Sequence, residues 1–415
     1  MPTNDLFGQA LGLASPWMVK EVRFSETESR LDIWLDFPAG SHWNCPTCGA
    51  GCGTAHDTND RTWRHLNFFQ HECYLHARVP RVRCSEHGTQ TVSVPWARPG
   101  MGFTLLMDAF ILGLAQAGMT VRQIAGMLKM HDTRIWRVLE YYVAKARREA
   151  DYSEVRHVGV DETAKARGHN YISVFMDLDP GRRRVLFVTD GREAETVSRF
   201  AEDLEAHGGK VENVDQVCLD MSPAYISGVE QYLPCAEMTF DQFHLVKLLN
   251  EAVDQVRREE QREHPELKKT RYVWLKNPWN HTEGQAEAYN DLRAGCLKTA
   301  RAYHLKLSFQ DLFLASNASE AEALLKGWYN WAVRCRLKPI VRFAQTIKRH
   351  WQGVINWFSS QISNGVLEAI NSLIQAAKAK ARGFRSFNYL ETVIYLIAGK
   401  LDLSPATVLQ ATHTK

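Results

Sequence analysis

Three carboxylates at the ends of expected secondary-structure elements constrain this chain more than any other feature. Two apolar runs, Val158–Glu162 and Val214–Asp220, are typical of buried strands, and they carry Asp161 and Asp220 where they end. Far downstream, Glu368 falls in the first turns of an expected helix. Mg²⁺ prefers oxygen ligands, and two such ions can hold both the attacking and the leaving oxygen of a phosphodiester. The pattern therefore predicts that two strand ends and one helix bring these acids to a pair of divalent cations.

The composition is that of an ordinary water-soluble, multidomain protein. Of 415 residues, 45% are hydrophobic and 23% charged, and a formal net charge of only +3 confines any nucleic-acid surface to a local patch. No apolar run approaches the roughly 18 residues of a membrane span, and the N-terminus lacks the features of a signal peptide. We therefore expect a cytoplasmic protein with no membrane partner.

The cysteines near the N-terminus are spaced for a metal. Cys45 and Cys48 form a C-x₂-C pair, and Cys84 and His87 form a C-x₂-H pair. Two such knuckles bridged by strands make a zinc ribbon, whose four protein ligands leave no open position for catalysis. Five other residues in this region compete for ligand roles: Cys52, Cys73, His56, His65 and His71. The alternative is a set of free thiols that bind no metal.

Residues 120–139 have the spacing of a helix-turn-helix. Apolar side chains recur on one face of a first helix and of a second, with Met130 and His131 at the turn between them. Asp132 or Thr133 can cap the second helix, whose first side chains would meet base edges in the major groove of DNA. The candidate DNA-binding residues are Arg122, Thr133, Arg134 and Arg137. The alternative is a plain helical hairpin with a solvated face.

Residues 151–250 combine strands with a helix. The expected elements are strands at His157–Asp161, Asn170–Leu178, Arg183–Val188, Val214–Asp220 and Ala236–Asp241, and a helix at Glu193–Ala206. Strands with short links are antiparallel, whereas a strand after a helical crossover is parallel to one of them. This is the ribonuclease H-like order, in which the fourth strand lies beside the first. Asp161 and Asp220 are then expected at neighbouring strand ends, and the rival carboxylates are Glu162, Asp177 and Asp241.

Residues 251–360 lack the alternation of strands and are expected to be helical. They hold half of the chain's 12 tryptophans: Trp274, Trp279, Trp328, Trp331, Trp351 and Trp357. Aromatic and basic side chains together can stack on unpaired bases, although the more frequent explanation is the core of an all-helical insertion.

The last part of the chain carries Glu368 on a helix that Asn364 can cap. Between Ala369 and Leu390 there is no acid, and there are four basic residues: Lys378, Lys380, Arg382 and Arg385. Cations placed after a metal-binding acid would hold the phosphates of the cleaved strand. The alternative is a solvated helix end, where cations also suit the helix dipole.

These stretches together resemble the DDE transposases of bacterial insertion sequences, and within them the ISL3 family. The matching stretches are Gly159–Thr163, Asp220–Tyr225, Phe240–His244, and Ser363–Asn371 followed by Ala381–Phe384. The resemblance implies a catalytic, metal-binding triad of Asp161, Asp220 and Glu368. It also implies zinc ligands at Cys45, Cys48, Cys84 and a fourth position that holds His87 here.

The family fold implied is a multidomain α/β chain with a zinc ribbon, a helix-turn-helix and a ribonuclease H-like catalytic domain interrupted by an all-helical insertion. The expected divisions are a zinc-binding domain at 1–100, the helix-turn-helix at 101–150, the first catalytic part at 151–250, the helical insertion at 251–360 and the last catalytic part at 361–415.

The function implied is that of a transposase that binds the terminal inverted repeats of its element and a target DNA, as a dimer or larger assembly. It would cleave and join DNA with two Mg²⁺ ions, for which Mn²⁺ is expected to substitute, beside a structural Zn²⁺. Bound to DNA, it would be associated with the bacterial nucleoid. No G-x-x-x-x-G-K-[ST] loop is present, so no nucleotide cofactor is expected. The alternatives are a transposase-derived DNA-binding regulator and a structure-specific ribonuclease H-like nuclease.

Overall fold

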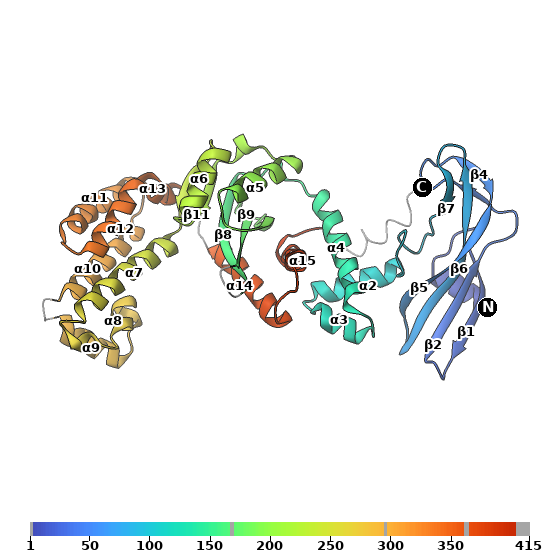
Figure 1. The fold of residues 1–415 in the computed structure, drawn as a ribbon, viewed down its shortest axis with the longest axis horizontal. Coiled ribbons are helices and arrows are strands. Elements are labelled where there is room, and N and C mark those ends of the chain that lie inside the picture. The colour runs from blue at the N-terminus through green and yellow to red at the C-terminus, as the bar shows by residue number, and fades with distance from the viewer. Residues whose placement is uncertain (1–2, 167–169, 294–296, 361–364, 404–415) are drawn as a thin grey trace. The chain divides into compact units, whose positions relative to one another are not determined.

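The chain forms two compact units, each with a hydrophobic core of its own (Figure 1). The computed structural model describes residues 3–166, 170–293, 297–360 and 365–403. Unit 1 comprises Met1–Arg147 with Leu401–Lys415, and unit 2 comprises Arg148–Lys400. No helix within the described ranges is both long and apolar enough to cross a bilayer.

Unit 1 begins with a helix and a five-stranded sheet in the order β1-β2-β6-β5, with β7 paired to β6. The elements are α1 (Thr3–Ala10), β1 (Met18–Ser25), β2 (Arg30–Asp36), β5 (Asp57–Phe68), β6 (His71–Cys84) and β7 (Gly88–Thr91). The antiparallel hairpin of β1 and β2 confirms the strand pattern of the sequence. Alternate residues of β6 are buried, as the period of a strand with one face on a core requires.

A second, two-stranded sheet carries the first cysteine pair. It consists of β3 (His42–Asn44) and β4 (Gly51–Thr54), which are antiparallel. Cys45 and Cys48 lie in the turn between these strands, and Cys84 and His87 lie where β6 turns into β7. Each pair therefore sits on a tight connection between two antiparallel strands.

Three helices complete unit 1: α2 (Leu105–Gln116), α3 (Val121–Met127) and α4 (Asp132–Arg148). The side chains expected to face inward are buried, namely Ile124, Ala125, Leu128, Ile135, Val138 and Leu139. Thr120 begins α3 in a capping box with Gln123. The helix-turn-helix expected from the apolar spacing is confirmed.

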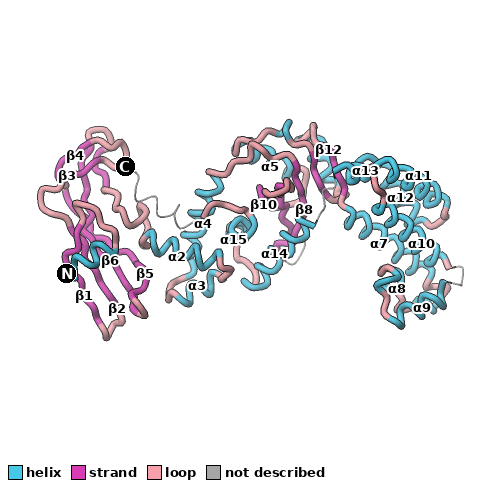
Figure 2. Tube along the Cα trace, turned by 180° about the vertical axis from the view of Figure 1, so that it is seen from behind, coloured by secondary structure: helices cyan, strands magenta, loops and turns pink. Residues whose placement is uncertain are grey.

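The sheet of unit 2 has five strands in the order β10-β9-β8-β11-β12 (Figure 2). Its strands are β8 (His157–Ala166), β9 (Asn170–Asp177), β10 (Arg184–Asp190), β11 (Gln216–Leu219) and β12 (Glu237–Phe240). The first three are antiparallel, while β11 is parallel to both β8 and β12. The prediction that the fourth strand of this part lies beside its first is confirmed.

Two details differ from the sequence-based expectation. Asp161 does not end its strand: β8 continues to Ala166 because its pairing with β9 persists there, although its pairing with β11 stops at Gly159. A helix, α6 (Pro223–Tyr232), lies between β11 and β12 where none was expected. The signal was present, since Ser222 is followed by Pro223, a favoured first helical residue.

The two faces of β8 are covered by different helices (Figure 1). Val158 and Val160 join the apolar core formed with α5 (Glu195–Ala206) and α6. Between them Gly159 faces α14 (Gly365–Ala381), the helix that carries Glu368. Because successive residues of a strand point to opposite faces, Asp161 lies on the α14 side. The expected capping residue Asn364 lies outside the described ranges.

The described residues between β12 and α14 form helices joined by turns, with no strand. Its helices of five or more residues are α7 (Gln242–Glu260), α8 (Arg271–Leu275), α9 (Glu283–Arg293), α10 (Lys298–Asp311), α11 (Ala318–Arg334), α12 (Lys338–Arg349) and α13 (Trp351–Ser360). Trp274 and Trp328 are core residues, whereas Trp279 is 75% exposed. Asn356 on α13 donates to the carbonyl of Met238 in β12 at 3.0 Å, which attaches these helices to the sheet edge. The last helix, α15 (Phe387–Ala398), packs on β10.

Candidate active site and zinc centre

α14 lies along β8 and contacts it at regular intervals. The contacts, written as helix residue and strand residue, are Leu367–Gly159, Asn371–Asp161, Gln375–Thr163 and Lys378–Ala164. In the first three pairs, helix residues four apart meet strand residues two apart, because about 5.4 Å of helix pitch nearly matches about 6.6 Å of strand. In the fourth pair, Lys378 instead reaches the backbone carbonyl of Ala164. This contact row sets the position of Glu368, which precedes Asn371 by one turn, relative to Asp161.

Asp161, in β8, has a pKa well above the ordinary value of an aspartate. Its Oδ1 accepts a hydrogen bond from the backbone N–H of Glu162 at 2.8 Å, and its Oδ2 accepts one from Asn371 at 2.6 Å. Burial raises the pKa of Asp161 to about 6, and the negative charges of Asp220 and Glu162 act in the same direction, whereas His244 opposes them. A carboxyl group that burial leaves poorly solvated is one that gains most from a bound cation.

Two further acids follow the strands next to β8. β11 runs parallel to β8 with Cys218 opposite Gly159, and β11 and β12 end opposite each other. Continuing this register by one or two residues places Asp161, Asp220 and Asp241 in one row across three strands. Neighbouring paired strands lie about 4.8 Å apart, so this register would give adjacent members of the row a similar spacing.

His244 faces this row from the first turn of α7. Asp241 caps that helix: one of its oxygens accepts from the backbone N–H of His244 at 2.9 Å and lies 2.8 Å from His244 Nδ1. The hydrogen bond with Asp241 raises the pKa of His244, burial opposes it, and the charges of Asp161 and Asp220 add to the increase. The site therefore contains a histidine whose cationic form is favoured by three neighbouring acids.

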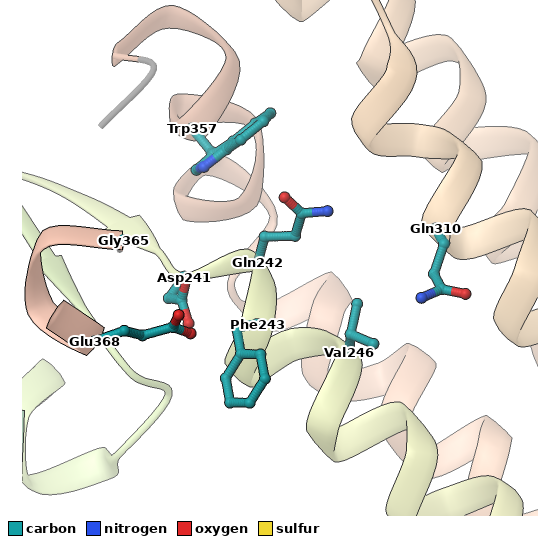
Figure 3. Close-up of a pocket in the computed structure, with 8 residues that line it drawn as sticks. All are labelled: Asp241, Gln242, Phe243, Val246, Gln310, Trp357, Gly365 and Glu368. Carbon is teal, nitrogen blue, oxygen red and sulfur yellow. The ribbon is translucent and has the colours of Figure 1, made fainter. Parts of the chain in front are cut away.

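Glu368 is exposed in the first turn of α14. It lines an open pocket of about 350 Å³ together with Asp241, Gln242, Phe243, Val246, Gln310, Trp357 and Gly365. The carboxylates of Glu368 and Asp241 point toward one another (Figure 3). Glu368 of α14 thus lies next to Asp241, the last acid of the row.

The three predicted catalytic acids are not gathered around a single point. Among the described residues, the one group of three or more His, Cys, Asp or Glu whose ligand atoms all lie within 4.8 Å of one another is in unit 1. Two ions about 4 Å apart need a wider set of ligands than one ion does. The residues fit such a pair in their chemistry, since Asp161, Asp220 and Glu368 offer the hard oxygen ligands that Mg²⁺ prefers.

The group in unit 1 consists of Cys45, Cys48, Cys84 and His87, the four residues of the two predicted knuckles. Cys48 Sγ lies 3.7 Å from Cys84 Sγ, and Cys84 Sγ lies 3.6 Å from His87 Nδ1. A tetrahedral Zn²⁺ with bonds of about 2.3 Å to sulfur and 2.0–2.1 Å to nitrogen has ligands separated by about 3.8 and 3.6 Å. These distances fit zinc. Of the competing residues, Cys73 is buried in the sheet, where burial raises the pKa of its thiol to about 12.

Comparison with known proteins decides the family. A family model for the ISL3 group, described as "Transposase", matches residues 158–394, more than half of the chain. The chain belongs to the ISL3 family of transposases. Two further models match the N-terminal part: "Helix-turn-helix domain of transposase family ISL3" at residues 92–143, and "zinc-finger of transposase IS204/IS1001/IS1096/IS1165" at residues 41–87. The family suggested by the sequence motifs is confirmed.

Relatives of this ISL3 transposase match over nearly the whole length. The chain is 27% identical over 425 residues to the transposase for insertion sequence element IS1557 of Mycobacterium tuberculosis, with 92% of each chain covered. It is 26% identical over 391 residues to the transposase for insertion sequence element IS1001 of Bordetella parapertussis, which covers 92% of this chain and 95% of the relative.

The candidate DNA-binding residues of the helix-turn-helix differ in their availability. Arg122, Thr133 and Arg137 are exposed. Arg134 is half-buried: its guanidinium carbon lies 4.3 Å from the ring centroid of Phe103, and it donates to a backbone carbonyl at 3.4 Å. Arg134 is therefore less available to DNA than Arg122 and Arg137, because its guanidinium packs on the ring of Phe103 within unit 1.

The basic run after Glu368 is also divided. Lys378 donates to the carbonyl of Ala164 in β8, and burial lowers the pKa of its ammonium group. Lys380, Arg382 and Arg385 are exposed. Three of the four predicted phosphate-binding residues therefore lie on the surface. The fourth, Lys378, contacts β8 as part of the contact row.

Reasoning from the sequence gave no role to Asn371, Gln375 or His244, although the structure places all three around the acids. The helical spacing that puts Asn371 and Gln375 on the face of Glu368 was visible. The spacing alone does not tell which strand this face of the helix packs against.

Proposed function

We propose that this transposase binds the terminal inverted repeats of its element and catalyses divalent-cation-dependent cleavage and joining of DNA. The observation that carries the proposal is the environment of Asp161. This acid is half-buried, its raised pKa is increased further by the charge of Asp220, which follows the adjacent parallel strand, and it contacts the helix that bears Glu368.

The architecture of unit 2 supports a ribonuclease H-like catalytic domain interrupted by a helical insertion. The sheet has three antiparallel strands followed by a helix and a parallel strand beside the first. The helices α7 to α13 stand between the strands and α14 in the sequence. In this proposal Asp220 and Glu368 belong to one domain although the insertion separates them.

Asp161, Asp220 and Glu368 are proposed as the residues that would hold the catalytic cations. When bound, such cations supply an activated water and offset the charge that develops on the phosphodiester. The chain's own contribution is orientation: the N–H of Glu162 and the amide of Asn371 fix the carboxylate of Asp161. The fixed geometry lowers the entropic cost of assembling the reacting groups.

Two reactions follow in the proposal. Water first attacks the phosphorus at the element's end, and the 3′-oxygen leaves as a hydroxyl. That hydroxyl then attacks a phosphodiester of the target, so that one P–O bond forms as another breaks and no nucleotide cofactor is needed. Arg382 and Arg385, exposed beyond Glu368, are proposed to contact the phosphates of the cleaved strand.

Unit 1 is proposed to hold a structural Zn²⁺ and to read the element's ends through the helix-turn-helix. Because two ends must be cut together, we propose at least a dimer on DNA. The exposed Arg122 and Arg137 suit contacts with DNA. Their positive charges would supply affinity for the phosphates, and a helix in the major groove would set the register on the DNA.

A cleavage assay on DNA that contains the terminal inverted repeats tests the proposal. The wild-type chain should nick the element's ends in Mg²⁺ and join them to a target. Asp161→Asn should lose both reactions and keep end binding in a gel-shift assay. Asp215→Asn, which neutralises an exposed acid just before β11, is the matched control and should cleave normally.

Cleavage in Mg²⁺ by Asp161→Asn at the wild-type rate would refute the assignment of this acid. Binding of the ends without any cleavage by the wild-type chain would instead indicate a DNA-binding regulator. Cleavage without joining would indicate a nuclease.

A further inference from the structure

Asn371 is the residue of α14 that contacts the candidate active site most directly. Its Nδ2 donates to Asp161 Oδ2 at 2.6 Å, a short hydrogen bond to an acid. The second oxygen of Asp161 already accepts from the backbone of Glu162. The carboxylate is therefore held at both oxygens, once by its own strand and once by the helix of Glu368.

The other amide atom of Asn371 has an unusual environment. Its Oδ1 is buried, and no hydrogen-bond donor reaches it within the part of the chain that the structure describes. A buried carbonyl oxygen left without a partner costs about 1–3 kcal/mol, and such groups commonly await a water molecule or an ion. An amide oxygen beside a half-buried carboxylate is chemically suited to a hydrated Mg²⁺.

The position of Asn371 in the helix links the acid it holds to Glu368. The two residues are three apart, so they lie on the same face of α14. One turn farther along, Gln375 Nε2 donates to Thr163 Oγ1 at 2.6 Å, two residues beyond Asp161 on the same face of β8. The side-chain amides of Asn371 and Gln375 thus keep α14 in register with β8. This register also fixes the position of Glu368 along the helix relative to Asp161.

We propose that Asn371 is a positioning residue of the metal site: its N–H group orients Asp161, it keeps Glu368 in register with that acid, and its Oδ1 accepts from the hydration shell of a bound cation. The inference rests on the proposed function, because it takes Asp161 and Glu368 as metal ligands. Gln375 supports the same register through its hydrogen bond with Thr163.

The test measures how cleavage depends on Mg²⁺ concentration, and separately the binding of Ca²⁺ by calorimetry to the full chain on end DNA. Asn371→Ala should raise the Mg²⁺ concentration for half-maximal cleavage by about 10–100-fold and weaken Ca²⁺ binding by a similar factor, as loss of outer-shell partners commonly does. Asn371→Leu, which keeps the volume but removes both polar atoms, should behave in the same way. Gln375→Ala should shift both values less.

Ser372→Ala is the matched control, because Ser372 is the next residue of α14 and is exposed. It should leave the Mg²⁺ dependence unchanged, and circular dichroism should show that all variants fold. Wild-type Mg²⁺ dependence and Ca²⁺ affinity in Asn371→Leu would overturn the inference, since packing alone would then explain the contact. If Glu368→Gln also cleaved normally, the proposed function would fail as well. If Glu368→Gln were inactive, only the role of Asn371 would be lost.

Discussion

At the scale of single residues, Asp161 shows a conflict between stability and function. Its raised pKa, about 6 against an ordinary value of 3.8, means that the folded chain binds this proton more tightly than the unfolded chain does. The free energy of unfolding must therefore fall as pH rises from about 4 to about 6, and the cost persists above that range. A buried acid kept at this cost is typical of a site that serves function rather than stability.

Asp161→Asn should consequently raise the melting temperature of the transition of unit 2 at pH 7.5 in buffer without divalent cations. The difference between the ordinary pKa of 3.8 and the value of about 6 in Asp161 corresponds to at most about 3 kcal/mol in the free energy of unfolding. The difference from wild type should shrink toward pH 4.5, where the carboxyl group is protonated in the folded chain and most of the cost of burying its charge is gone. Calorimetry at the two pH values measures it, and a stabilisation that is equal at both would exclude ionisation as the cause.

At the scale of elements, the contact between β8 and α14 depends on a residue without a side chain. A Cβ on Gly159 would lie 2.9 Å from Leu367 and 3.1 Å from Leu178. Both contacts are tighter than side chains normally tolerate, so a larger residue at this position must displace the side chains of Leu367 and Leu178 or move α14 away from the strand. The absence of a side chain here allows Leu367 of α14, the neighbour of Glu368, to pack closely against β8.

Gly159→Val should therefore lower the rate of end cleavage by about 100-fold without altering any acid, since misplacing a catalytic group by about 1 Å has effects of that size. Adding Leu367→Ala should recover part of the rate by restoring space. Gly327→Ala, in a helix position with no neighbour near the added atom, is the control. Equal rates for Gly159→Val and wild type would mean that α14 does not need this close approach.

The helix-turn-helix gives a second prediction for an element. Arg137 is exposed on α4, whereas Arg134 lies over Phe103. Arg137→Ala should weaken binding of end DNA about tenfold and lower the slope of log Kd against log salt by about one, as for a lost phosphate contact. Arg134→Ala should change that slope less. Fluorescence anisotropy at several salt concentrations measures both, and the reverse order would place Arg134 at the DNA.

Much of each element could be predicted from the sequence, because periodicity reports local burial. The strands of unit 2 and the two knuckles lie where the pattern of Val158–Asp161 and of Cys45–Cys48 indicated. The sequence did not reveal that β8 extends beyond Asp161, since that depends on which neighbour each half of the strand pairs with. It also could not place Asn371 against Asp161, because 210 positions separate them.

At the scale of the whole molecule, the zinc cluster and the helix-turn-helix share unit 1, and the acids lie in unit 2. His65 Nδ1 lies 2.9 Å from the hydroxyl of Thr104, which caps α2, so the sheet of unit 1 contacts the start of α2 directly. Loss of zinc from unit 1 should therefore weaken DNA binding, whereas loss of a carboxylate in unit 2 should not.

Cys48→Ser should lower the zinc content, measured by atomic absorption, from about one ion per chain to near zero, and should weaken end binding. Asp161→Asn should retain both zinc and binding while it loses cleavage. Full zinc content in Cys48→Ser would show that another residue, such as Cys52, supplies the fourth ligand. A wild-type Kd without zinc would separate the metal from DNA recognition.

Metal-ion rescue of Asp220→Cys tests most directly whether the acids of unit 2 hold catalytic cations. A thiolate is a poor ligand for Mg²⁺ and a better one for softer divalent ions such as Mn²⁺. Cleavage of the element's ends by this variant should be lost in Mg²⁺ and return in Mn²⁺, while Asp215→Cys should cleave in both. Wild-type activity of Asp220→Cys in Mg²⁺, or no return of activity in Mn²⁺, would contradict the account.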